Sequence, residues 1–212
     1  TLIAVLLYFY QDWVGMIKAG FKNGLKTKDG KMFWYLILAT IPAGVVGLLL
    51  EHKIEEIFRG DMLVIAAGLA IMGVVLYLVD KICLQKLTLQ KITLAQAVII
   101  GCCQTLALIP GVSRSGITMT TARALGFTRE AAAKFSFFLA TPIIAGAAVK
   151  HFADIITHLF NPLFWVGTLV SAVVGLFCIG FLLKYLQKNN FAIFALYRIA
   201  LSIIIVIVYY YR

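Results

Sequence analysis

The residues best suited to chemistry form a short polar turn, Pro110-Gly111-Val112-Ser113-Arg114-Ser115-Gly116, between two apolar arms. The first arm, Ile92–Ile109, carries no charged residue, and the second, Ile117–Phe127, carries only Arg123. An arginine at membrane depth is costly and marks a functional site by default. Irregular backbone persists at that depth only where protein shields it or where it lines a watery cavity.

The local chemistry of the turn suits an oxyanion. Pro110 has no N–H and biases Ile109 away from the helical region, and Gly111 permits a left-handed turn. Either Ser113 or Ser115 can cap the helix that follows. The free N–H groups in the first turn of that helix then point into the tip, where the helix dipole favours negative charge.

Side chains of the turn add to this anion site. The guanidinium of Arg114 can grip two phosphate oxygens at once. Ser113, Ser115 and Thr118 supply hydroxyl donors, and Gly111 and Gly116 let the backbone come close to the anion. A purely structural cap with a snorkelling arginine is the alternative, but snorkelling from a hairpin tip at mid-depth is geometrically difficult.

The composition is that of a membrane protein. The chain is 62% hydrophobic and 13% charged, where soluble domains carry about 25% charged residues, and its mean hydropathy is +0.98. Several segments reach the spanning length of about 20 residues. We expect spanning helices over Thr1–Ile17, which reads as a helix already under way, and over Met32–Leu50, Met62–Val79, Arg129–Val149, Leu163–Leu183 and Phe191–Tyr211.

The formal net charge of +10 does not indicate nucleic-acid binding, because the lysines sit in short loops and no basic face with stacking aromatics is visible. Basic residues dominate the loops Lys18–Lys31, Asp80–Lys91 and Lys184–Asn190, whereas acidic residues dominate Glu51–Asp61. This is the positive-inside pattern, and it places the three basic loops in the cytoplasm.

This topology makes the segment that carries the polar turn re-entrant. The helices before and after it both have their near ends on the cytoplasmic side, so Ile92 and Thr128 lie on the same face. Each arm is too short to need to cross at about 1.5 Å rise per residue. We therefore predict an all-α, polytopic integral membrane protein, with six transmembrane helices and one re-entrant helical hairpin.

Other polar residues carry smaller hypotheses. Arg198, in the last helix, is either a second cation near a bound anion or a brace for a carbonyl group. Gln104, in the first arm, either donates to the turn or packs structurally. Arg123 is near the cytoplasmic end of its arm and is expected to snorkel. The histidines, at positions 52, 151 and 158, fall in or beside the two outer loops, and no metal-ligand spacing is present.

The string from Gln104 to Thr118, which contains Pro-Gly-Val-Ser-Arg-Ser-Gly, resembles the second signature of the undecaprenyl-diphosphate phosphatase (bacitracin-resistance) family. Phe135–Pro142 resembles the family's following helix, and Tyr197-Arg198 its final-helix pair. The resemblance implies a membrane hydrolase that converts a C55 isoprenyl diphosphate to the monophosphate and recycles the cell-wall lipid carrier. It also implies a fold of two interlocked inverted repeats, each with a re-entrant hairpin and three spanning helices.

The family's first signature, a glutamate-rich stretch ending in Pro-Val-Ser-Ser-Thr-Gly-His, is not in this sequence. We therefore expect residues 1–91 to hold three spanning helices of a truncated first repeat, 92–127 the hairpin and 128–212 three spanning helices of the second repeat, in one membrane domain. The missing hairpin would precede Thr1. The resemblance places the base, the nucleophile and the ligands of any divalent cation, Mg²⁺ or Ca²⁺, on that segment.

We assign Arg114, Ser113 and Ser115 as catalytic candidates, and Gly111, Gly116, Thr118, Gln104 and Arg198 as phosphate-binding candidates. The expected partners are an isoprenoid diphosphate lipid, the bilayer of a bacterial inner membrane and a second copy of the chain. A polyprenyl-phosphate flippase or transporter is the alternative, since inverted repeats with broken helices are also a transporter architecture. An inactive fragment is the third interpretation, and the activity of these 212 residues alone is left open.

The loop charges generate a topology prediction. Lys26 should face the cytoplasm, while Glu55 and His158 should face outside. The test labels single cysteines at these positions with a membrane-impermeant maleimide on intact cells, after the native cysteines have been replaced. Labelling of position 26 from outside would overturn the hairpin topology.

Overall fold

The computed structural model describes residues 1–58, 61–158 and 160–211, and within these residues it is helical with no strand. The first part of the chain forms α1 (Leu2–Tyr8), α2 (Tyr10–Asn23), the 3₁₀ turn η1 (Gly24–Lys26), α3 (Lys28–Phe58) and α4 (Met62–Ile82). The 3₁₀ turn η2 (Leu89–Lys91) leads to α5 (Leu94–Gln104), η3 (Thr105–Leu108) and α6 (Arg114–Ala124). The last part forms α7 (Arg129–Lys150), α8 (Phe152–His158), α9 (Pro162–Lys188) and α10 (Ala192–Tyr211).

Five described helices are long and apolar enough to cross a bilayer, namely α4, α7, α9, α10 and, within α3, Lys28–Leu50. This confirms a helical, multi-pass membrane protein. Their surfaces agree, because large apolar side chains such as Leu48, Phe177 and Tyr210 are well exposed. Exposed apolar faces on this scale suit contact with lipid and would be a liability in water.

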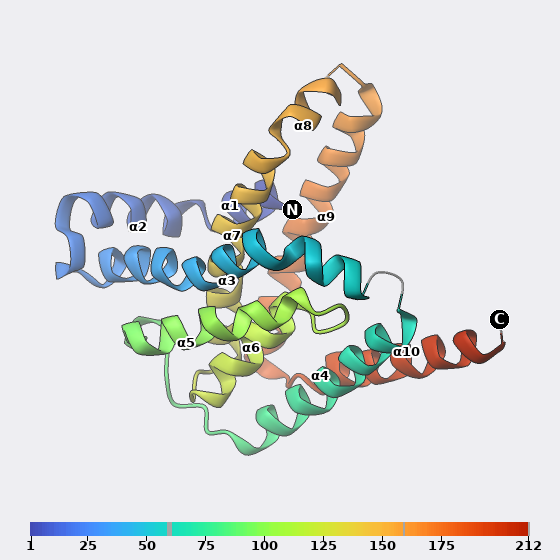
Figure 1. Cartoon of the computed structure of the whole chain (residues 1–212). Helices are drawn as coiled ribbons and strands as arrows, with labels where there is room; N and C mark the ends of the chain where they lie inside the picture. Colours follow the sequence, from blue (N-terminus) through green and yellow to red (C-terminus); the bar gives the residue numbers. More distant parts are fainter. Residues whose placement is uncertain (59–60, 159, 212) are drawn as a thin grey trace.

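The prediction of one continuous helix over Thr1–Ile17 is wrong in one respect. The chain bends by 80° between Leu2–Tyr8 and Tyr10–Lys26, so the sixth span exists only if this broken pair counts as one. At the bend Phe9 is 3% exposed, and its ring packs against Phe138 with the ring centroids 5.0 Å apart. Beyond the bend α2 packs along α3 (Figure 1). Burial of one aromatic side chain therefore decides where the helix breaks.

The segment with the polar turn folds back on itself as a hairpin of α5 and α6 near the centre of the molecule (Figure 1). The chain just before and just after it lies side by side, because the backbone N–H groups of Lys86 and Leu87 donate to the carbonyl of Gly126. Thr128 N–H donates in return to the Leu87 carbonyl. The two ends of the hairpin are thus fixed to one another, as a re-entrant segment requires.

A buried ionic cluster fastens the base of the hairpin. Asp80, at the end of α4, is 5% exposed, and its carboxylate accepts from Arg123 Nε and Arg129 Nε, both at 2.9 Å. The backbone N–H of Phe191 donates to its other oxygen at 3.0 Å. One carboxylate therefore joins the end of α4, the end of α6 and the starts of α7 and α10.

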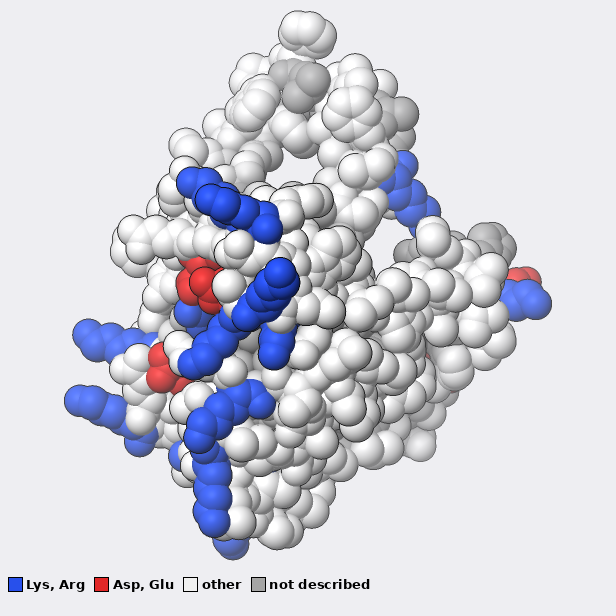
Figure 2. Space-filling view, turned by 90° about the vertical axis from the view of Figure 1, so that its left-hand side faces the viewer, with Lys and Arg blue, Asp and Glu red and all other residues white. Residues whose placement is uncertain are grey.

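Lysine and arginine side chains gather on the face that carries the α2–α3 turn and the α4–α5 loop (Figure 2). Exposed lysines of α2, the α2–α3 turn, the start of α3 and the α4–α5 loop include Lys18, Lys22, Lys26, Lys31 and Lys86. Two of the three loops that were expected to be cytoplasmic, Lys18–Lys31 and Asp80–Lys91, therefore contribute to one face (Figure 2). The outward placement expected of Glu55 and His158 falls on side chains outside the described part of the chain.

The ionic cluster yields a stability prediction. Asp80→Asn leaves Arg123, which is fully buried, without its carboxylate, so unfolding free energy should fall by about 3–5 kcal/mol. Reversible unfolding in mixed micelles measures the change. The matched control is Asp12→Asn, which breaks the half-exposed Asp12–Lys134 pair and should cost no more than about 1 kcal/mol. Equal losses for the two variants would show that the cluster does not fasten the fold.

Candidate functional site at the hairpin tip

The tip is a sharp, partly strained turn. Ile109 is extended before Pro110, as expected, and Gly111 has a left-handed φ of +88°. Ser113 has φ +62° and is the single described residue other than glycine with positive φ. Such a conformation costs of order 1–3 kcal/mol and is concentrated at functional sites. Ser113 is also the N-cap of α6, since its Oγ accepts from Gly116 N–H at 3.3 Å.

Helix α4 holds the tip by two glycine contacts. A methyl group on Gly68 would lie 2.6 Å from the carbonyl oxygen of Pro110. A methyl group on Gly111 would clash with the carbonyl oxygen of Ile65. The backbones of α4 and the turn therefore touch directly, and side chains larger than hydrogen would push the tip away.

Arg198 reaches the tip from α10 on another side. Its Nη1 donates to the Val112 carbonyl at 3.4 Å, and its guanidinium covers Gly116, where an added methyl group would lie 2.6 Å from Nη2. The structure thus places Arg198 as a brace on the turn, one of the two roles expected from the sequence. Its proximity to Gly116 also puts positive charge beside the start of α6.

The first turn of α6 offers free donors. Ile117 N–H donates to the Ser113 carbonyl and Gly116 N–H to the Ser113 side chain. The N–H groups of Arg114 and Ser115 have no protein partner among the described residues. These two donors, at the positive end of the helix dipole, are the local components of an anion site.

Arg114 and Ser115 line a cavity of about 400 Å³. Arg114 is half-buried, and its guanidinium has no acidic partner among the described residues. Among the described residues, no aspartate, glutamate or histidine lines this cavity. The cavity therefore presents a cation and helix N–H groups to any anion that enters it.

The other buried arginine behaves differently. Arg123, expected to snorkel, is fully buried instead, bound to Asp80 and to the carbonyl groups of Asp80, Cys83 and Phe127. The snorkelling expectation was wrong because a carboxylate 43 residues away in sequence, at the end of α4, meets Arg123 in the fold. Hairpin residues thus include one arginine neutralised by protein and one, Arg114, that is not.

Thr118 does not face the cavity as a free hydroxyl. It is 1% exposed, its Oγ1 donates to the Arg114 or Ser115 carbonyl at 3.0 and 3.2 Å, and it shares a 2.7 Å hydrogen bond with Ser136 Oγ. Its single proton is used by the backbone in this arrangement, so Ser136 donates to Thr118. Thr118 therefore joins α6 to α7, and its expected role as a phosphate ligand stays a prediction.

Gln104 lies at the end of α5 and is 2% exposed. Neither its Oε1 nor its Nε2 has a hydrogen-bond partner among the described residues. A buried, unpaired amide costs about 1–3 kcal/mol per group and calls for an explanation. Gln104 remains a candidate donor at the tip on this ground, and its role as a phosphate ligand stays a prediction.

Ser136 is the site residue that sequence analysis missed. It lies on α7, is 4% exposed, and lines the cavity together with Arg114 and Ser115. The available signal was a hydroxyl in an otherwise apolar stretch, Phe135–Ala140. That signal is weak, because serines are common at helix-packing positions in membrane proteins.

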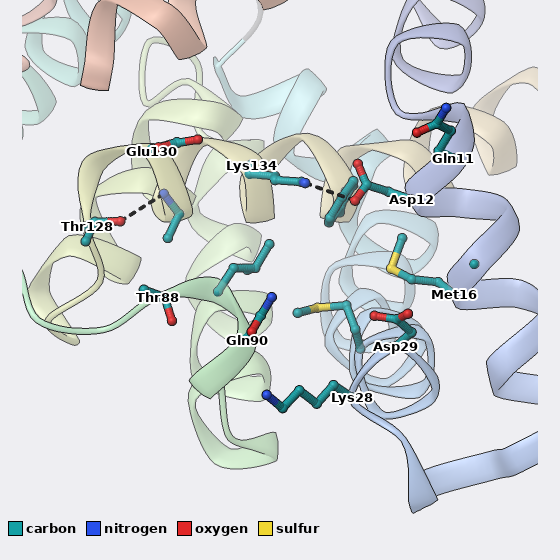
Figure 3. Close-up of a pocket in the computed structure, with 15 residues that line it drawn as sticks. Gln11, Asp12, Met16, Lys28, Asp29, Thr88, Gln90, Thr128, Glu130 and Lys134 are labelled. Carbon is teal, nitrogen blue, oxygen red and sulfur yellow. Dashed lines mark hydrogen bonds and ion pairs between the residues drawn. The ribbon is translucent and has the colours of Figure 1, made fainter. Parts of the chain in front are cut away.

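A second pocket, of about 600 Å³, lies on the basic face between α2, α3, η2 and α7 (Figure 3). Its charged lining residues are three acids and two lysines, namely Asp12, Asp29, Glu130, Lys28 and Lys134, and Lys134 Nζ donates to Asp12 Oδ1 at 3.0 Å. Lys134 is also held over the rings of Phe9 and Phe138. With three carboxylates and two ammonium groups in its lining, this pocket suits a phosphate less well than the tip does.

The described residues contain no group of three or more His, Cys, Asp or Glu side chains able to hold a metal ion. The donors gathered at the tip are cationic or neutral, and they fit an anion, not a cation.

Comparison with known proteins identifies relatives along the whole chain. The sequence profile of the family described as bacitracin resistance protein BacA matches residues 1–204. A protein of Elusimicrobium minutum named undecaprenyl-diphosphatase is 51% identical over 207 residues, covering 98% of this chain and 79% of the relative. Proteins with the same name from Desulforudis audaxviator and Caldicellulosiruptor bescii are each 45% identical, covering 98% and 100% of this chain and 79% and 80% of the relatives.

The glycine contacts at the tip generate a prediction. Gly111→Ala should destabilise the fold by at least about 2 kcal/mol, because the positive φ costs about 1–2 kcal/mol and the methyl group meets a backbone carbonyl. The control is Gly44→Ala in α3, where nothing lies within 4 Å and helix propensity favours alanine by up to about 1 kcal/mol. Unfolding in mixed micelles compares the two. A neutral Gly111→Ala would mean that α4 does not fix the turn.

Proposed function

This chain belongs to the bacitracin resistance protein BacA family, and we propose that its hairpin tip binds the diphosphate of an isoprenyl lipid for hydrolysis to the monophosphate. The lipid indicated by the relatives' name is undecaprenyl diphosphate. The observation that carries the proposal is Arg114, a half-buried guanidinium without a carboxylate partner among the described residues, beside the two free N–H groups that open α6.

Electrostatics supports this role for Arg114. A cation inside the membrane is retained when an anion or a polar pathway needs it. Arg123 and Arg129 each form an ion pair with Asp80, so their charges are neutralised within the protein and stabilise the fold. Arg114 is free to form the two parallel N–H···O bonds that guanidinium makes with phosphate.

The proposed reaction is transfer of the terminal phosphoryl group to water. In the net reaction the terminal phosphorus gains an oxygen from water, the bridging P–O bond breaks, and isoprenyl monophosphate leaves with the bridging oxygen, while the proton that water loses passes to the base. Charge on the transferring group and on the leaving oxygen must be stabilised, and positioned donors supply most of the catalysis in such transfers. Arg114, with the N–H groups of Arg114 and Ser115, supplies that stabilisation here.

The neighbouring residues take supporting parts in the proposal. Ser113 accepts from Gly116 N–H, so its own hydroxyl hydrogen can donate to a phosphate oxygen. Ser115 is exposed at the cavity and adds a second hydroxyl. Arg198 fixes the Val112 carbonyl and brings a second positive charge to the helix start.

We assign neither the base nor the nucleophile to the described residues, because no carboxylate or imidazole lines the cavity. The curated relatives are longer, as the chain spans about four fifths of their length. Our proposal places the base, the nucleophile and the ligands of any divalent cation on sequence outside these 212 residues.

The protein is a multi-pass membrane protein, and we propose the bacterial cytoplasmic membrane as its location with the basic face (Figure 2) toward the cytoplasm. Self-association through the exposed apolar helix faces is a separate part of the proposal. Mass photometry in nanodiscs distinguishes a homodimer from a monomer.

The central substitution is Arg114→Ala, made in the longest natural reading frame that contains this sequence. Phosphate release from farnesyl or undecaprenyl diphosphate should fall about 100- to 1000-fold, or about 2.7–4 kcal/mol, by analogy with removal of one oxyanion donor. Arg114→Lys should restore only part, because an ammonium cannot form the paired bonds of a guanidinium.

The control for Arg114→Ala is Arg198→Ala, which removes the brace and should cost less. Both variants must retain the unfolding midpoint of the parent to within the error of the measurement. If Arg114→Ala is folded and keeps activity within about threefold of the parent, the phosphate-binding role of Arg114 is wrong and the tip is a structural turn.

A further inference from the structure

The cavity that receives Arg114 and Ser115 has a polar end and apolar walls. Its polar groups are Arg114 and Ser115 of the tip, Ser136 of α7, and Thr1, which precedes α1. The walls are apolar and come from α1, α7 and α9; they include Val5, Phe137, Ile144, Ile179 and Leu182. A site of this kind matches an amphiphile whose anionic head meets the arginine.

Small residues create the space along the walls. Ala140 on α7 and Gly175 and Cys178 on α9 line the cavity beside their larger neighbours. Gly175 also lets α1 approach, because a methyl group there would lie 2.8 Å from the Cβ of Ala4. The width of the cavity between α7 and α9 therefore depends on the size of these three side chains.

The cavity is continuous with the lipid-facing surface of α9. Cys178 is exposed although it lines the cavity, and its helix neighbours Val174, Phe177 and Phe181 are 53%, 75% and 69% exposed. At about 400 Å³ the cavity lies near the lower end of small-molecule sites, about 300–1,000 Å³. It has room for the start of a long apolar chain, whose remainder would lie in the bilayer.

Resting on the proposed function, we infer that the first isoprene units of the substrate lie between α7 and α9, with Cys178 as a residue that sets chain specificity. The head is fixed by Arg114 at one end, and the chain leaves past Cys178 into the membrane. For short diphosphates that enter from water, each CH₂ group that the walls cover contributes about 0.8 kcal/mol, so these walls favour farnesyl over isopentenyl diphosphate.

The first test compares two diphosphates in the longest natural reading frame that contains this sequence. Cys178→Phe fills the space that the chain would occupy. The ratio of kcat/KM for farnesyl diphosphate to that for isopentenyl diphosphate should fall at least tenfold. Cys102→Phe, at an exposed cysteine of α5 outside the cavity, is the matched control and should leave the ratio within twofold of the parent.

A second measurement does not depend on turnover or on the bulky variant. A protein whose sole cysteine is Cys178 reacts with a small maleimide, and a non-hydrolysable farnesyl methylenediphosphonate should slow that reaction at least tenfold. Free methylenediphosphonate, which lacks the chain, should slow it less than twofold. A protein with Cys102 alone should show no protection by either compound.

The outcomes distinguish the proposed position of the isoprenyl chain in the cavity from the proposed hydrolysis. The proposed position of the isoprene units between α7 and α9 is overturned by either of two results. One is that Cys178→Phe lowers both kcat/KM values equally, and the other is that the farnesyl compound protects Cys178 no better than free methylenediphosphonate does. If no isoprenyl diphosphate is hydrolysed by the parent but the farnesyl compound still protects Cys178, the proposed hydrolysis is wrong, while the position of the chain in the cavity is supported.

Discussion

The arrangement of this protein depends on one buried carboxylate. The Asp80 carboxylate accepts from two guanidinium groups and a backbone N–H. These donors, at Arg123, Arg129 and Phe191, lie 43, 49 and 111 residues from Asp80 in sequence. Burying charges is costly, and the cost is offset only when every partner is present. The end of α4, the base of the hairpin and the start of α10 are therefore assembled together, which fixes where the hairpin begins and ends. Its tip is then placed by direct backbone contact with α4 at Gly68 and Gly111.

This division explains why two hairpin arginines have different fates. At the base, Arg123 is neutralised and serves the fold. At the tip, Arg114 stands beside unpaired N–H groups and faces a cavity without acidic lining. Protein charge thus remains uncompensated where a phosphate would compensate it, and the strained φ of Ser113 is tolerated at the same place. The rigid base allows the tip to hold this unfavourable arrangement ready for a ligand.

Apolar runs, loop charges and the Pro-Gly-x-Ser-Arg-Ser-Gly turn were sufficient to predict most of the helices, the hairpin and the capping of α6 by a serine of the turn, which the structure shows to be Ser113 and not Ser115. They failed where a long-range contact decides the outcome. The bend at Phe9 depends on an aromatic contact with α7, and the burial of Arg123 depends on Asp80, which was read as a loop residue. Ser136 and the hydrogen bond that withdraws Thr118 from the cavity likewise require the packing of α6 on α7. Periodicity and charge predict elements, whereas pairing between elements depends on geometry that no local pattern contains.

The most direct measurement of the central claim is a structure with a bound non-hydrolysable isoprenyl diphosphate analogue. The account predicts the terminal phosphate at the start of α6, with its oxygens about 2.7–2.9 Å from the Arg114 guanidinium nitrogens. It also predicts contacts with the N–H groups of Arg114 and Ser115. A diphosphate bound elsewhere, for instance in the pocket beside Asp12 and Lys134 (Figure 3), with Arg114 making no contact to it, would contradict the account.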